Sequence, residues 1–195
     1  FGGWVLFADL VNAQLIAGRD LTVKDVRNLA RYQEAKKRFG LDEREGRTPW
    51  DAQKSSANAN DLRGAILRVK PKADGGYTIP AGNLFKPGTK GTRPEIFVMG
   101  TRNSFRLGID PNNGYVYWGD VGPDARFPNP NYGPAGFDEI NQARTAGFFG
   151  WPYFVGTNKA YREFDYAADE AAPAYDVNKP INNSPNNTGI KENIK

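Results

Sequence analysis

From Arg63 onward, the sequence consists of short runs rich in Ile, Val, Tyr and Phe, separated by turn sequences. The runs are AILRVK, GYTIP, EIFVMG, FRLGID and YVYWGDV, and the segments DGG, PGTKG and DPNNG lie between them. β-Branched and aromatic residues favour strands, whereas Gly, Asn and Asp tolerate the backbone angles of tight turns. The segment FRLGIDPNNGYVYWGD therefore predicts one antiparallel hairpin with residues 112–114 at its tip.

The segments that follow this hairpin predict fewer regular elements. DEINQA and FFGWPYF are predicted to pair as a further strand and its return. The residues after Gly156 contain several Asn and Pro and show little periodicity, which predicts an irregular tail. Short strands at hairpin spacing are typical of a sandwich, a barrel or a propeller, and periodicity alone does not choose among these all-β folds.

Residues 1–40 differ from the rest of the chain. Thr22 is a candidate N-cap, apolar residues recur with helical spacing after it, and Gly40 supplies a stop. This pattern predicts a helix over residues 23–38. The basic residues 36–38 would then complement the helix dipole, which favours a structural role for them over nucleic-acid binding.

The composition excludes several classes of site. The 195 residues carry a net charge of +4 and include neither histidine nor cysteine. Disulfides, thiolate chemistry and a histidine general base are therefore excluded within this chain, and no apolar run is long enough to span a bilayer. The chain begins at Phe1 and its only methionine is Met99, which predicts an internal piece of a longer protein.

Candidate site residues lie where predicted strands end. Arg102 and Asn103 follow the run EIFVMG, and Gly122 and Pro123 form a corner after YVYWGDV. Loops at strand ends are where an all-β scaffold assembles a polar site. A turn contact for Arg102 and ordinary turn punctuation for the Gly-Pro pair remain open as alternatives.

Four acidic residues surround the Gly-Pro corner in the sequence, namely Asp120, Asp124, Asp138 and Glu139. Carboxylates in this position suit a calcium site or would orient Arg102. A solvated loop is the alternative for Asp120 and Asp124. We expect the nearby aromatic residues to pack in the core rather than against a ligand; these are Trp118, Phe149, Trp151 and Tyr153.

The segment RNSFRLGIDPNNGYVYWGDVGPD, followed by FDEINQARTAGFFGWPY, resembles the glucose/sorbosone dehydrogenase family. The stretch DEREGRTPWDAQKSSANANDLRGAILRVKP and the later SPNNTG extend the resemblance over roughly residues 42–190. That family comprises sugar dehydrogenases dependent on pyrroloquinoline quinone (PQQ), built on a six-bladed β-propeller. Such a propeller needs about twice this length. The resemblance therefore implies an incomplete β-propeller of about three blades over residues 41–195, preceded by the N-terminal helical segment 1–40, which does not match the family.

The resemblance also implies roles for single residues. Arg102 and Asn103 match an Arg-Asn pair that lies against the quinone in the family, with the arginine near the reactive carbonyl. Gly122 and Pro123 match a Gly-Pro pair whose carbonyl oxygens bind the Ca²⁺ on the quinone. Glu139 matches a position associated with a structural Ca²⁺. A fixed guanidinium is chemically suited to this task, because hydride transfer to a carbonyl carbon leaves negative charge on its oxygen.

The implied activity is oxidation of an aldose or a sorbosone-like sugar, with hydride transfer to PQQ. The resemblance further implies a periplasmic or secreted protein with an electron acceptor such as a c-type cytochrome. Family members use a histidine from an earlier blade as the base, and this chain has none, so we expect the chain alone to be inactive. A non-catalytic propeller module that binds a glycan or a protein partner is the alternative.

Overall fold

The computed structural model describes residues 52–165, 170–185 and 187. These residues form β-strands and one short 3₁₀ turn, η1 (Ala52–Lys54), without any α-helix. The expectation of an all-β chain is therefore confirmed for the described part, whereas the predicted helix over 23–38 lies outside it. Within the described residues, no helix has the length and apolar character needed to cross a membrane.

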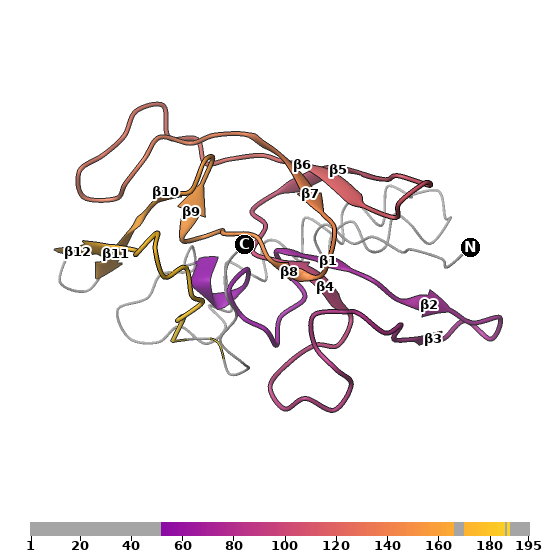
Figure 1. Cartoon of the computed structure of the whole chain (residues 1–195). Helices are drawn as coiled ribbons and strands as arrows, with labels where there is room; N and C mark the ends of the chain where they lie inside the picture. The colour runs from indigo at the N-terminus through magenta and orange to yellow at the C-terminus, as the bar shows by residue number, and fades with distance from the viewer. Residues whose placement is uncertain (1–51, 166–169, 186, 188–195) are drawn as a thin grey trace, which may run out of the picture.

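The predicted hairpin forms two neighbouring strands of a three-stranded sheet, with its second strand in the centre. Strands β5 (Ser104–Ile109), β6 (Val116–Asp120) and β7 (Glu139–Ala143) are antiparallel neighbours in that order (Figure 1). Gly114 adopts a φ of 73° at the turn, and its N–H donates to the Asp110 carbonyl at 2.8 Å. Glycine adopts this left-handed conformation without steric cost, so the sequence specifies the turn directly.

A second three-stranded sheet contains one parallel pair. Strand β4 (Ile96–Met99) lies between β1 (Ala65–Leu67), which is antiparallel to it, and β8 (Gly147–Phe148), which is parallel. The predicted pairing of FFGWPYF with DEINQA is wrong. β7 pairs with β6 instead, while the fully buried Phe148 anchors β8 beside Met99.

The remaining strands form three two-stranded pairs, so the sheets do not close on one another. These pairs are β2 (Lys70–Pro71) with β3 (Tyr77–Thr78), β9 (Phe154–Val155) with β10 (Lys159–Ala160), and β11 (Arg162–Asp165) with β12 (Glu170–Ala174). The prediction of an irregular tail after Gly156 is therefore wrong for the strand residues 159–160, 162–165 and 170–174. The β12 side chains are mostly exposed, which explains why no apolar alternation marked this pair in the sequence.

Two apolar clusters form the core. One gathers around β1, β4 and the segment after β8, and the other lies between β4 and the β5–β6–β7 sheet. Trp118 and Tyr153 are buried in these clusters, as expected. Phe149 is partly buried, packs edge-on against Trp118 at the second cluster and also lines a pocket. Trp151 is partly buried and lines the pocket instead of packing in either cluster.

Candidate functional site

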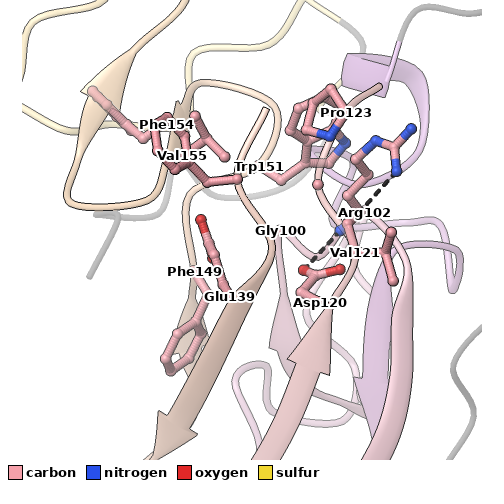
Figure 2. A pocket seen from close by; sticks show the side chains of 12 residues that line it. Gly100, Arg102, Asp120, Val121, Pro123, Glu139, Phe149, Trp151, Phe154 and Val155 are labelled. Atoms are coloured by element: carbon pink, nitrogen blue, oxygen red, sulfur yellow. Dashed lines mark hydrogen bonds between the residues drawn. The ribbon is translucent and has the colours of Figure 1, made fainter. Parts of the chain in front are cut away.

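A shallow pocket lies where β4 and β6 end and β7 begins (Figure 2). Its lining includes Arg102, the corner Gly122–Pro123, Glu139 and the ring of Trp151. Four of the five residues assigned to a cofactor or metal from the sequence are thus brought together, although 37 positions separate the first from the last in the chain. The enclosed volume is about 10 Å³, which is room for one water molecule.

The turn that carries Arg102 is held by a buried carboxylate. Asp120, at the end of β6, is only 8% exposed. One of its oxygens accepts the backbone N–H of Arg102 at 3.0 Å (Figure 2). The other oxygen accepts the backbone N–H of Asn103 at 2.6 Å. The carbonyl of Asn103 in turn accepts the Val121 N–H at 3.0 Å. Asp120 therefore fixes the backbone of the Arg-Asn pair, and the side chain of Asn103 is exposed outside the pocket.

The guanidinium of Arg102 lies over the pocket with much of its donor capacity unused. Its Nη1 donates to the Val121 carbonyl at 2.8 Å, and its Cζ lies 5.7 Å from the ring centre of Trp151. Within the described part of the chain, no carboxylate forms an ion pair with it and no other acceptor takes its remaining N–H groups. An arginine with free donors beside an aromatic ring is suited to a ligand that presents acceptor oxygens.

The corner at Gly122 is packed tightly against the start of β7. The Gly122 N–H donates to Asp138 Oδ1 at 2.9 Å. A Cβ atom at Gly122 would lie 2.1 Å from the carbonyl oxygen of Phe137. Only glycine permits this approach of two backbones, so the corner requires glycine for steric reasons.

The carbonyl of Pro123 is already used within the protein. It accepts the Ala125 N–H at 2.7 Å. The backbone of Gly136 covers the same oxygen, because a Cβ atom there would lie 1.7 Å from it. Pro123 lines the pocket, but in this conformation its carbonyl oxygen is engaged elsewhere.

Both carboxylate oxygens of Glu139 also accept protein donors. Oε1 accepts the Gly156 N–H, and Oε2 accepts Asn141 Nδ2 at 3.1 Å. Glu139 is the register partner of Asp120 across β6 and β7, so two carboxylates stand side by side at the pocket floor. Burial raises the pKa of Asp120 and the charge of Glu139 adds to this, against the opposing effect of the amides that Asp120 accepts.

Residues 40–186 match the family described as Glucose / Sorbosone dehydrogenase. The chain belongs to the glucose/sorbosone dehydrogenase family. Among curated proteins, it is 29% identical over 119 residues to the HIPL2 protein of Arabidopsis thaliana, covering 54% of this chain and 15% of that protein.

Parts of this chain also align with solved structures of dehydrogenases. A Thermus thermophilus oxidoreductase described as a glucose dehydrogenase is 30% identical, with 52% of this chain and 27% of that one covered and a TM-score of 0.40. The soluble aldose sugar dehydrogenase of Escherichia coli, in its apo-form, is 26% identical, with 50% and 23% covered and a TM-score of 0.34. The chain thus spans between 15% and 27% of the length of these relatives. Family membership rests on the match over residues 40–186 and not on these superpositions.

The family resemblance implies a quinone and a Ca²⁺ ion, and the pocket fits the quinone better than the ion. The unused donors of Arg102 suit the oxygen-rich edge of a quinone. The enclosed volume of the pocket is too small to contain the whole quinone. The fit to Ca²⁺ is poor, since the oxygens of Pro123 and Glu139 already accept protein N–H groups. The part of the chain with defined positions also contains no cluster of three acidic side chains arranged for a metal.

The other acidic candidates lie outside the pocket. Asp124 is exposed and does not line it, and Asp138 is exposed but accepts the amide of the Gly122 corner. The alternative of a solvated loop residue therefore describes Asp124 best, whereas Asp138 has a structural role.

One residue beside the pocket was not singled out in the sequence. Tyr161 packs edge-on against Trp151, with ring centres 5.7 Å apart. Its hydroxyl is buried without a hydrogen-bond partner among the described residues. Burial raises the pKa of Tyr161 to about 12, and the charges of Arg102 and Glu139 both act on it. Because Tyr161 falls in the segment that was expected to be irregular, no sequence pattern marked it.

Proposed function

We propose that this chain forms one wall of the cofactor site of a PQQ-dependent sugar dehydrogenase that oxidises an aldose or a sorbosone-like sugar. The observation that supports this most is the position of the Arg102 guanidinium, which has unused donors and lies in one pocket with the Gly122–Pro123 corner. Membership of the glucose/sorbosone dehydrogenase family supplies the class of substrate.

Each pocket residue has a definite task in this proposal. When bound, PQQ supplies an acceptor for the hydride that leaves the sugar carbon. Arg102 binds an oxygen of the ligand and stabilises negative charge on it. Asp120 holds the backbone that carries Arg102, and the Val121 carbonyl holds its guanidinium. Pre-organisation of this kind lets the guanidinium act without a further cost of ordering it.

The proposal also includes features that depend on the rest of the active site. The sequence contains no histidine, so the sugar hydroxyl has no histidine proton acceptor within this chain, and we expect no turnover from it alone. We retain Ca²⁺ as a proposal on family grounds alone, with Gly122 and Pro123 as the candidate carbonyl ligands and Glu139 as the candidate for a structural ion. Pro123 and Glu139 would first have to release the N–H groups that they accept. Periplasmic or secreted location and electron transfer to an acceptor such as a c-type cytochrome are proposed on the same basis.

Titration of the purified chain with PQQ, followed by tryptophan fluorescence, tests the proposal, because Trp151 lies at the pocket. We expect Arg102→Ala to weaken binding about tenfold or more, since a hydrogen bond to a charged group contributes about 1.5–3 kcal/mol. Arg102→Lys should give an intermediate loss because lysine lacks the planar fork. Arg106→Ala is the matched control, because Arg106 is exposed and does not line the pocket.

Equal PQQ affinity of the wild type and the Arg102→Ala variant would contradict the proposed role of Arg102. Repeating the titration with and without Ca²⁺ tests the metal separately, and Ca²⁺-independent binding would contradict the calcium proposal. If the chain does not bind PQQ but binds a glycan or a protein partner, the alternative of a non-catalytic binding module is favoured instead.

A further inference from the structure

The hydroxyl of Tyr161 is buried and accepts or donates no hydrogen bond among the described residues. Most buried polar groups in proteins have a partner, so this one requires an explanation. The position of the residue is well fixed, because its N–H donates to the Tyr153 carbonyl at 2.8 Å and its carbonyl accepts the Tyr175 N–H at 3.0 Å. The ring also packs on Gly133, where a Cβ atom would lie 3.0 Å from Cδ1.

The ring of Tyr161 lies next to the pocket, although Tyr161 does not line it. Trp151 contacts the Tyr161 ring edge-on, with an angle of 88° between the ring planes, and the same indole lies 5.7 Å from the Arg102 Cζ. The charges of Arg102 and Glu139, which both line the pocket, act on the phenol. Tyr161 and Arg102, which both have unused donors, are thus neighbours of the same indole.

We propose that Tyr161 is a ligand-binding residue whose hydroxyl donates a hydrogen bond to a carbonyl or carboxylate oxygen of the molecule that Arg102 binds. The inference rests on the proposed function, since it takes PQQ as that molecule. Tyr161 itself does not line the pocket, so the partly exposed indole of Trp151 must turn aside for the ligand to reach the hydroxyl, while Asp120 keeps the backbone of Arg102 in place. Because burial raises the pKa of Tyr161 to about 12, the phenol keeps its proton and remains a donor at neutral pH.

Tyr161→Phe tests this role, because it removes only the hydroxyl and keeps the ring that packs on Trp151 and Gly133. We expect PQQ affinity to fall about tenfold, the effect of losing one hydrogen bond to a polar or charged acceptor. We expect the unfolding midpoint in urea to stay the same or to rise, because a buried hydroxyl without a partner costs free energy in the ligand-free protein. A residue with a purely structural role would instead show unchanged PQQ affinity and a lower unfolding midpoint in urea.

Two control variants separate the possible outcomes. Tyr153→Phe removes a hydroxyl that donates to Asn182 at 2.8 Å, so its midpoint should fall, and a similar fall for Tyr161→Phe would overturn the proposal. Tyr117→Phe, on the outer side of β6 away from the pocket, should leave PQQ affinity unchanged.

The failure of this inference and the failure of the proposed function can be told apart. If Arg102→Ala weakens PQQ binding and Tyr161→Phe does not, the inference is overturned while the proposed function stands. If the wild-type chain does not bind PQQ, both are overturned.

Discussion

Replacing Gly122 with alanine should unfold the corner of the pocket, because the added methyl group has no space. Its Cβ would lie 2.1 Å from the carbonyl oxygen and 2.5 Å from the carbonyl carbon of Phe137. Both are backbone atoms, so no side-chain rotation relieves the overlap, and the corner must move away from the start of β7. Forced overpacking of this kind costs about 1–3 kcal/mol.

The movement would also break a hydrogen bond. The Gly122 N–H donates to the Asp138 carboxylate at 2.9 Å, and a bond to a charged group contributes about 1.5–3 kcal/mol. Together the two effects predict a loss of about 2.5–6 kcal/mol in the free energy of unfolding, a large part of the roughly 5–15 kcal/mol typical of a domain. The displaced corner would also carry away the Val121 carbonyl that Arg102 uses, so PQQ affinity should fall with stability.

Urea unfolding followed by circular dichroism measures the stability change, and Gly119→Ala provides the matched control. Gly119 lies on β6, three positions before Gly122, and no atom lies within 4 Å of where its Cβ would be. A surface substitution with free space usually changes stability by about 0.5 kcal/mol or less. If Gly122→Ala and Gly119→Ala have the same unfolding free energy, the steric account of the corner is refuted.

Three further predictions concern single contacts. Although burial alone would raise it, the pKa of Glu95 is lowered from 4.5 by its backbone amide, the Tyr77 hydroxyl and a neighbouring guanidinium. The ionised Glu95 carboxylate therefore stabilises the folded protein fully well above pH 4.5, and this stabilisation is lost as the pH falls through the lower folded-state pKa. Glu95→Gln should reduce the dependence of the unfolding free energy on acidic pH, measured by urea unfolding at several pH values. An unchanged pH dependence would contradict this prediction. Tyr153→Phe should cost about 1–2 kcal/mol in the same assay, because it leaves Asn182 without the phenolic donor; a neutral effect would refute this. Asp138→Ala should cost about 1.5–3 kcal/mol through loss of the corner bond, and a greater loss than that of Gly122→Ala would contradict the order of the two effects.

The parts of the fold that follow from nearby residues could be predicted from the sequence. The β5–β6 hairpin is set by a glycine turn and two adjacent β-prone runs, so its tip at residues 112–114 was predictable. The parallel pairing of β8 with β4 was not, because it depends on two short segments nearly 50 positions apart and on the burial of Phe148. β12 was missed for a related reason: its side chains are mostly exposed, so it presents no continuous apolar face.

The candidate site shows the same division between local and distant information. The sequence indicated that Arg102 and the Gly-Pro corner belong together, and the structure places them in one pocket. The task of Asp120 depends on the register that sets Ser104 opposite Asp120. That register brings the carboxylate to backbone amides 17 and 18 positions away, which composition and spacing do not reveal.

The way the acidic residues are used determines what kind of ligand the pocket suits. Asp120, Asp138 and Glu139 were all candidates for metal binding, yet each accepts at least one backbone N–H from a loop at the pocket. Part of their acceptor capacity holds these loops, and a cation needs several acceptor oxygens that can converge on it. Two groups with unused donors are the guanidinium of Arg102, at the pocket, and the hydroxyl of Tyr161, whose ring lies next to it. Donors without partners are matched by a ligand with several acceptor oxygens, so the pocket as folded is better suited to the carbonyl and carboxylate groups of a quinone than to a free metal ion.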